Sequence, residues 1–346
     1  MLFTKLAIGS LALGLATASP VDNSLTHRGL NSLEVDDAPS YVRPYIMRHY
    51  AHAQALTIGA QTYRFYRHYE NFFNLKGRYQ LWAQKDNATQ QSRIIGPGDY
   101  GSVARNTTHT FQILEPDTEM IGAIAPGGFE QLFFAQGTNL TNPVRTAHVP
   151  QFDNETSAAG PDADVISSLE SFDVYAQLEF ETRTDLIDGA APSGTGWHTE
   201  TNDLGAAGEP YFIANGWGPK YLNSAHGYQI VAPLATGVQT QDTNFTMATI
   251  SMSVTPGNVT VPVWKMGGAT AFQVIEGKFD VQIAGHDTAE LTTGDVVFIP
   301  PDTSFKYWSE AAFTKVLVLS GGHEGIDQVL IEGGEAYDFV TFPVNW

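Results

Sequence analysis

The 346-residue chain contains no cysteine. This absence excludes disulfides, thiolate metal sites, iron–sulfur clusters and cysteine nucleophiles. Charged residues are also scarce, at 16% of the chain, and 18 basic residues against 37 acidic ones give a net charge of −19. Because so few Lys and Arg remain to neutralise phosphates, the composition argues against nucleic acid and anionic membranes as partners. The 12% of aromatic residues argues against a disordered chain, and the length predicts about two domains.

Long apolar runs are missing as well. The stretch from Leu6 to Leu15 is apolar but, at about ten residues, too short to span a bilayer of ~30 Å. Lys5 precedes this stretch, and the small residues Ala16-Thr17-Ala18 follow it, which is typical of a signal peptide. We therefore predict that residues 1–18 are removed and that the mature protein is secreted into the extracellular space, with no membrane anchor.

Sequons for N-glycosylation support a secreted protein. The six Asn-x-Ser/Thr sites are Asn87, Asn106, Asn139, Asn154, Asn244 and Asn258. Asn106 is the candidate exception, because the motifs described below place it beside a predicted metal site. The other sequons predict surface glycans.

Strand patterns dominate the remaining sequence. Short runs rich in aromatic and β-branched residues, such as "RYQLWAQ", "QLFFAQG", "ATISMSV" and "DVVFIP", are separated at close intervals by Gly, Pro, Asn and Asp. The best helical pattern runs from Val165 to Leu178. We predict an all-β protein with one domain at 19–148, a long linker at 149–209 and a second domain at 210–346.

The two predicted domains share an internal repeat. The segment "ENFFNLKGRYQLW" with "GDYGSVARNTTHTF" matches "TAFQVIEGKFDVQI" with "GDVVFIPPDTSFKYW". The matched pairs are Glu70 with Thr270, Gly77 with Gly277, Gly98 with Gly294, and His109 with Phe305. Each glycine permits the positive φ of a tight turn. Four matched positions with one small gap favour a duplication over chance similarity.

The first copy carries the motif pair of the cupins, Glu-x6-Gly followed by Gly-x5-Pro-x-Gly-x2-His, with Ala104 and Asn106 in place of the Pro and the second Gly. Nearly the whole mature chain further resembles the secreted fungal quercetin 2,3-dioxygenases, which are copper-dependent bicupins. The stretches that carry this resemblance include "EVDDAPSYVRPYIMRHY", "RHYENFF", "EPYFIANGWGPKYLN", "HGYQIVAP" and "SFKYWSEAAFTKVLVLS". The resemblance implies two jelly-roll β-barrels joined by the long linker.

The resemblance also implies a metal site in the first barrel, formed by three imidazoles and a carboxylate. Glu70 matches the carboxylate, which in the family is also the catalytic base, and His109 matches the imidazole that crosses the barrel. These donor types suit copper and similar ions, with one Cu2+ per chain in an intact site. In the second barrel Phe305 replaces the motif His and Thr270 replaces the Glu, so we expect no metal there.

Two expected ligands are missing from the first barrel. A His-x-His pair should stand five to seven positions before Glu70, where this chain has Tyr63, Arg64 and Phe65. Either the sequence lacks a segment of about thirty residues between Arg67 and His68, which we favour, or the protein is a degenerate cupin without metal. His68 could in principle replace one imidazole, although an ordinary pocket histidine is the preferred interpretation.

The resemblance implies a flat aromatic substrate, a flavonol such as quercetin, held against an apolar wall. The residues that match this wall are Tyr63, Phe72, Phe111, Met120 and Ile124. For each of them, plain barrel core is an equally good interpretation. The implied reaction uses O2, opens the central ring and releases carbon monoxide. The alternative is a non-catalytic bicupin that binds aromatic compounds or has a structural role. The sequence leaves the oligomeric state open, a homodimer included.

Overall fold

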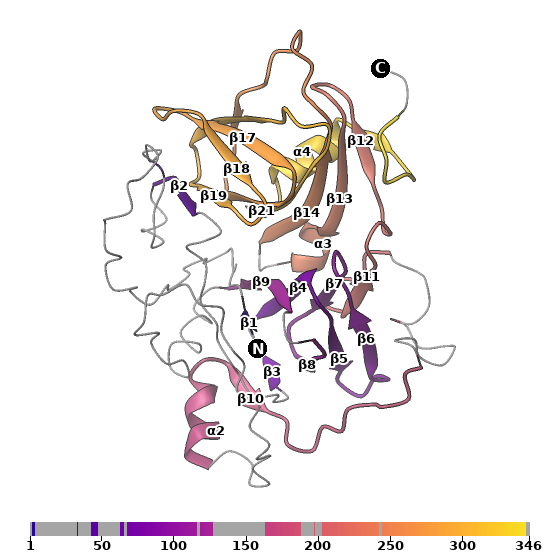
Figure 1. Ribbon diagram of the computed structural model, residues 1–346. Helices are drawn as coiled ribbons and strands as arrows, with labels where there is room; N and C mark the ends of the chain where they lie inside the picture. Colours follow the sequence, from indigo (N-terminus) through magenta and orange to yellow (C-terminus); the bar gives the residue numbers. More distant parts are fainter. Residues whose placement is uncertain are drawn as a thin grey trace. The chain divides into compact units, whose positions relative to one another are not determined.

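The computed structural model describes residues 2–3, 33, 43–47, 63–65, 68–115, 118–126, 163–187, 197, 203–241 and 244–343. Strands are far more abundant than helices among these residues (Figure 1), so the all-β prediction is confirmed. The chain divides into two compact units. The first comprises Met1–Ala16 and Ala53–Asn215, and the second comprises Thr17–His52 and Gly216–Trp346.

The first unit is built from two five-stranded sheets. One has the order β1-β9-β4-β7-β11, with β1 at Leu2–Phe3, β9 at Glu119–Ala125, β4 at Tyr69–Lys76, β7 at Tyr100–Val103 and β11 at Tyr211–Ile213. The other has the order β10-β3-β8-β5-β6, with β10 at Val174–Ala176, β3 at Tyr63–Phe65, β8 at Thr107–Ile113, β5 at Tyr79–Lys85 and β6 at Gln91–Ile95. Helix α2 spans Ala163–Glu170.

The second unit also has two sheets. The eight-stranded sheet has the order β2-β19-β16-β21-β14-β13-β12-β22. Its strands are β2 (Tyr45–Met47), β19 (Val296–Ile299), β16 (Thr270–Glu276), β21 (Thr314–Gly321), β14 (Phe245–Met252), β13 (Gln229–Ala235), β12 (Tyr221–Asn223) and β22 (Glu335–Ala336). The four-stranded sheet joins β15 (Trp264–Lys265), β20 (Ser304–Trp308), β17 (Lys278–Ile283) and β18 (Ala289–Thr292). The short helices are α3 (Gly237–Thr240) and α4 (Ile326–Glu332).

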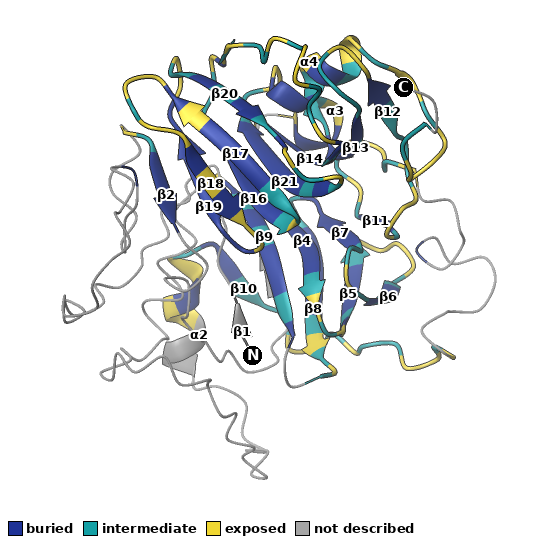
Figure 2. Cartoon of the chain, turned by 45° about the horizontal axis from the view of Figure 1, so that its top comes forward, coloured by how far each residue is buried: buried dark blue, intermediate teal, exposed yellow. Residues whose placement is uncertain are grey.

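Side chains from both sheets fill the second unit. Phe272, Phe279 and Phe305 are fully buried there, and the rings of Phe272 and Phe279 lie 5.1 Å apart. Figure 2 shows the matching pattern, with β16 and β21 dark blue along most of their length. Burial of each such ring contributes about 1.5–3 kcal/mol to folding. The interior of this barrel is therefore filled by its own side chains.

The strand registers confirm the predicted repeat. Glu70 pairs with Val103 and Ile124, and Thr270 pairs with the equivalent residues, Ile299 and Ser320. The predicted turn glycines have positive φ in both copies, at 67° and 85° in the first and 81° and 88° in the second. Strand β4 thus lies between β7 and β9 as β16 lies between β19 and β21.

Three strands do not belong to the domain in which the predicted boundaries place them. Strand β2 pairs with β19 in the second unit, although 19–148 was predicted to form the first domain. Strand β11 pairs with β7 in the first unit, although the second domain was predicted to begin at 210. Strand β10 lies within the predicted linker and pairs with β3. Backbone pairing over such sequence distances leaves no local pattern in the residues.

The helix in the linker region is shorter than the predicted one, which extended from Val165 to Leu178. Helix α2 ends at Glu170, and Asp173, with a φ of 67°, turns the chain into β10. Further along, the indole of Trp82 donates to the Arg183 carbonyl at 2.9 Å, so this part of the linker lies against β5. Among the helices that the structure describes, none has the length and apolar character to cross a bilayer. Most of the predicted signal peptide lies outside the described residues, and its removal stays a prediction.

Candidate active site

Glu70 and His109 face each other inside the first unit. Glu70 lies on β4 and His109 on β8, which belong to different sheets, and both residues are 4% exposed. Alternation along β4 places Glu70 and Phe72 on one face and Tyr69, Asn71 on the other. The carboxylate Oε2 lies 2.9 Å from the imidazole Nε2. The structure therefore brings together the two residues that the motifs singled out.

Both ring nitrogens of His109 have hydrogen-bond partners. Its Nδ1 lies 3.0 Å from the Thr107 carbonyl, which can only accept, so Nδ1 carries a proton and donates it. The second carboxylate oxygen, Oε1 of Glu70, is buried and has no hydrogen-bond partner in the part of the chain that the structure describes. An unpartnered buried oxygen is costly unless something binds it.

His68 is committed to a different partner. Its Nδ1 lies 2.9 Å from Oδ2 of Asp173, and both side chains are buried. Asp173 follows α2, so it comes from the predicted linker, 105 residues away from His68. The sequence offers no signal for this pair, because a lone Asp in an acidic chain has no distinguishing spacing. The arrangement agrees with the interpretation of His68 as a pocket histidine.

Aromatic and aliphatic side chains continue the face that carries the Glu–His pair. The ring centroid of Phe72 lies 6.0 Å from that of His109 and 6.0 Å from that of Phe111. Phe72 and Met120 belong to one buried apolar cluster, and Phe111 packs against it. Ile124 lies opposite Glu70 in the register of β4 and β9. Tyr63 is opposite His109 in register, and its side chain lies outside the described part of the structure.

The other face of β4 carries a buried polar cluster that the sequence did not reveal. The hydroxyls of Tyr69 and Ser102 lie 2.6 Å apart, and Tyr100 donates to the Asn71 side chain. Burial raises the pKa of Tyr69 to about 12 and raises the pKa values of Tyr100 and Tyr211 well above their ordinary range. These phenols therefore stay neutral and act as hydrogen-bonding groups that hold β4 in place.

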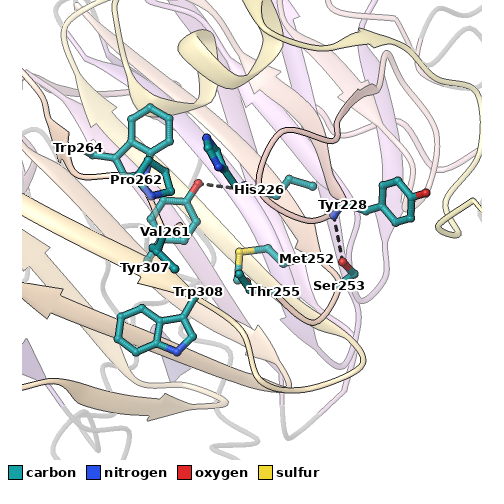
Figure 3. Close-up of a pocket in the computed structure, with 11 residues that line it drawn as sticks. His226, Tyr228, Met252, Ser253, Thr255, Val261, Pro262, Trp264, Tyr307 and Trp308 are labelled. Carbon is teal, nitrogen blue, oxygen red and sulfur yellow. Dashed lines mark hydrogen bonds between the residues drawn. The ribbon is translucent and has the colours of Figure 1, made fainter. Parts of the chain in front are cut away.

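The second unit has no counterpart of the Glu–His pair. Its equivalent residues, Thr270 and Phe305, are both buried. A hollow of about 310 Å³, counting the part open to solvent, lies at one end of this barrel (Figure 3). Its lining includes His226, Tyr228, Gln229, Met252, Ser253, Thr255, Val261, Pro262, Trp264, Tyr307 and Trp308. Tyr307 donates to Gln229 at 2.7 Å across it, and none of the predicted site residues takes part.

The donors present fit a transition metal in type but not in number. An imidazole whose Nδ1–H donates to a carbonyl presents Nε2 as a ligand, and a carboxylate beside it is a common companion. However, no three His, Asp or Glu side chains among the described residues are grouped so that they could hold an ion. Two protein ligands give little preorganisation for an ion such as Cu2+. The residues that the structure describes do not form a complete metal site.

Comparison with known proteins identifies close relatives. The chain is 53% identical over 348 residues to the quercetin 2,3-dioxygenase of Aspergillus japonicus, with 91% of this chain and 99% of the relative covered. It is 21% identical over 252 residues to the quercetin 2,3-dioxygenase of Bacillus subtilis, with 72% and 67% covered. No model of a known protein family matches the chain.

Solved structures give weaker likenesses. A deletion mutant of the Bacillus subtilis oxalate decarboxylase aligns with a TM-score of 0.44 and 14% identity, covering 76% of this chain and 65% of that one. The oxalate decarboxylase of Lactobacillus farciminis aligns with a TM-score of 0.42 and 14% identity, covering 77% and 75%. TM-scores this low support no argument about this chain.

Proposed function

Because the chain belongs to the quercetin 2,3-dioxygenase family, we propose that it is a flavonol 2,3-dioxygenase. The observation that carries the proposal is the 53% identity, which extends over 91% of this chain and nearly the full length of the Aspergillus relative. In the proposed reaction one O2 adds to the flavonol, the central ring opens, and one carbon monoxide leaves. This identity favours the dioxygenase over the non-catalytic bicupin that the missing ligands suggested.

The described residues suggest what the protein does in this reaction. The buried carboxylate of Glu70 would accept the proton of the flavonol 3-hydroxyl, and its Oε1, which has no hydrogen-bond partner among the described residues, is an acceptor for that hydroxyl. Phe72 and Phe111 would hold the flat rings by stacking and exclude water. Removing the proton makes the substrate electron-rich and therefore reactive towards O2.

The metal is part of the proposal. The resemblance implies copper, and the described residues supply only Glu70 and His109 towards it. We propose that the natural protein contains an additional segment between Arg67 and His68, with the missing His-x-His. The match to the Aspergillus relative supports this: it extends over 348 residues, whereas 91% of this 346-residue chain is about 315 residues. About 33 aligned positions of the relative therefore have no counterpart here.

Turnover by the protein isolated from its natural source tests the function. We expect quercetin to disappear with one O2 consumed and one carbon monoxide released per flavonol. In the same protein, Phe72→Ala should raise KM because Phe72 lies on the face that carries Glu70 and His109. Phe73→Ala is the matched control: it removes an equally buried ring from the opposite face of β4, so it should lower stability and leave KM unchanged. No flavonol consumption with copper supplied would refute the proposal.

Secretion and glycosylation are proposals from the sequence. Asn87, Asn244 and Asn258 are exposed, which supports glycans at these three sequons. Asn106 has a φ of 60° in the turn before β8, and Asn139 and Asn154 lie outside the described residues. Amino-terminal sequencing of the mature protein should begin near Ser19, and an N-glycosidase should reduce its mass.

A further inference from the structure

The disagreement between the family's metal and the ligands of this chain leads to a specific inference, which rests on the proposed function. We infer that the 346-residue polypeptide, as its sequence stands, holds no transition-metal ion at the Glu70–His109 pair. The deciding positions are 63 and 65. Two imidazoles at these positions would complete the ligand set, and the chain has Tyr63 and Phe65 instead.

The backbone register identifies these positions. Strand β3 pairs with β8 so that Tyr63 is directly opposite His109 and Phe65 is opposite Thr107. Directly opposed residues lie on the same face of a sheet, and residues two apart on a strand share that face. Positions 63 and 65 therefore belong to the face of β8 that carries His109, whose Nε2 reaches Glu70 at 2.9 Å. Phenol and benzene side chains there offer no imidazole nitrogen.

The second barrel supports this placement independently. Its strand β15 pairs with β20 so that Trp264 is opposite Phe305, the residue equivalent to His109. Position 63 thus corresponds to position 264. The side chain of Trp264 packs against the barrel core and stacks on Tyr307 at 6.4 Å (Figure 3), and Met266, two residues on, belongs to the same core. Trp264 on β15 and Met266 just after it therefore both pack against the interior in the copy whose side chains are described.

Among the described residues, the histidine closest in sequence to Glu70 is already engaged. His68 precedes Glu70 by two residues, but its Nδ1 contacts Asp173 at 2.9 Å in a buried pair. Turning it towards Glu70 would break this buried contact with Asp173. The Glu70–His109 pair is meanwhile closed on itself by its own hydrogen bond. Glu70 and His109 therefore form a hydrogen bond with each other and do not act as two ligands of an ion.

Metal content of the purified full chain tests the inference. The chain is incubated with excess Cu2+, dialysed, and analysed for copper by mass spectrometry and for imidazole coordination by electron paramagnetic resonance. We expect on the order of 0.1 ion or less per unmodified chain, and about one ion per chain for Tyr63→His/Phe65→His. Adding His109→Ala to the double variant should reduce the bound copper about 10-fold.

The second barrel provides the matched control. Trp264→His/Met266→His introduces the same two imidazoles on the equivalent strand, where Phe305 and Thr270 offer no further ligand, so it should gain no copper. Far-ultraviolet circular dichroism checks that each variant folds. If the double variant does not fold, Phe65→His alone should still bind more copper than the unmodified chain.

Two results would overturn the inference. One is an unmodified chain that retains about one copper ion and loses it on His109→Ala. The other is a folded Tyr63→His/Phe65→His variant that binds no more copper than the unmodified chain. Neither readout involves a flavonol. Absence of turnover in the natural protein would therefore refute the proposed function without touching this inference.

Discussion

Asp280 is a buried carboxyl whose replacement should stabilise the protein. It lies on β17, is 5% exposed, and its Oδ2 has no hydrogen-bond partner among the described residues. Its direct cross-strand neighbours are Glu290 and Trp308, so a like charge lies beside it. Burial raises the pKa of Asp280 from 3.8 to about 6; Lys278 opposes the shift, and Glu310 and Glu290 add to it.

The sign and size of the effect follow from this shift. The folded state holds the Asp280 proton more tightly than the unfolded state, so its contribution to stability is fully present below pH 3.8 and lost as the pH rises through about 6. The full shift corresponds to at most about 3 kcal/mol. Because Lys278, Glu290 and Glu310 are substantially exposed, screening by water reduces the expected loss to about 1–2 kcal/mol.

Urea unfolding of Asp280→Asn, followed by tryptophan fluorescence, measures this. The free energy of unfolding of the variant minus that of the unmodified protein should increase by about 1–2 kcal/mol between pH about 4 and pH about 8. Asp302→Asn is the control: Asp302 is exposed, 3.8 Å from Lys265, and should show a pH-dependent difference within about 0.5 kcal/mol. A difference for Asp280→Asn that is flat or falls with pH would refute the reasoning.

Three further substitutions test the packing of the two barrels. Phe279→Ala should lower the free energy of unfolding by about 3–5 kcal/mol, because the ring is fully buried; a loss below 1 kcal/mol in urea unfolding would contradict this. Gly277→Ala should lower the melting temperature far more than Gly285→Ala. Both glycines have a φ above 80°, so the backbone strain is similar, but a Cβ at 277 would lie 2.3 Å from a backbone carbonyl oxygen, whereas a Cβ at 285 would meet nothing within 4 Å. Equal losses would rule out the steric explanation. Asp173→Ala should lower the free energy of unfolding by about 1–3 kcal/mol through loss of the His68 contact, and Asp173→Asn by less, because Asn keeps an acceptor and tolerates the left-handed backbone; equal losses would contradict a role for that contact.

Features that depend on local periodicity could be predicted from the sequence. The two-residue alternation of strands places Glu70 with Phe72 and His109 with Phe111, and in the structure the two pairs face each other from different sheets. The matched glycines at 77 and 277 helped to predict the repeat. Both have a positive φ, which glycine adopts readily because it has no Cβ.

Features that depend on distant pairing could not be predicted. Strand β2 pairs within the second unit, and β10 pairs with β3 of the first unit from within the predicted linker, because backbone hydrogen bonds do not depend on side-chain identity. The same applies to Asp173, whose role is decided by the turn that brings it to His68. In each case the partner is more than 100 residues away, and a single sequence carries no trace of such a pairing.

The intact mass of the natural protein after glycan removal tests the central claim most directly, namely that a dioxygenase frame here lacks the segment with its remaining ligands. At the mean of about 109 Da per residue given by 37.6 kDa over 346 residues, 33 residues add about 3.6 kDa. We predict a mass that exceeds that of residues 19–346 by about this amount, with the added peptide between Arg67 and His68. A protein of the mass of residues 19–346 that still contains one tightly bound copper ion would contradict the account.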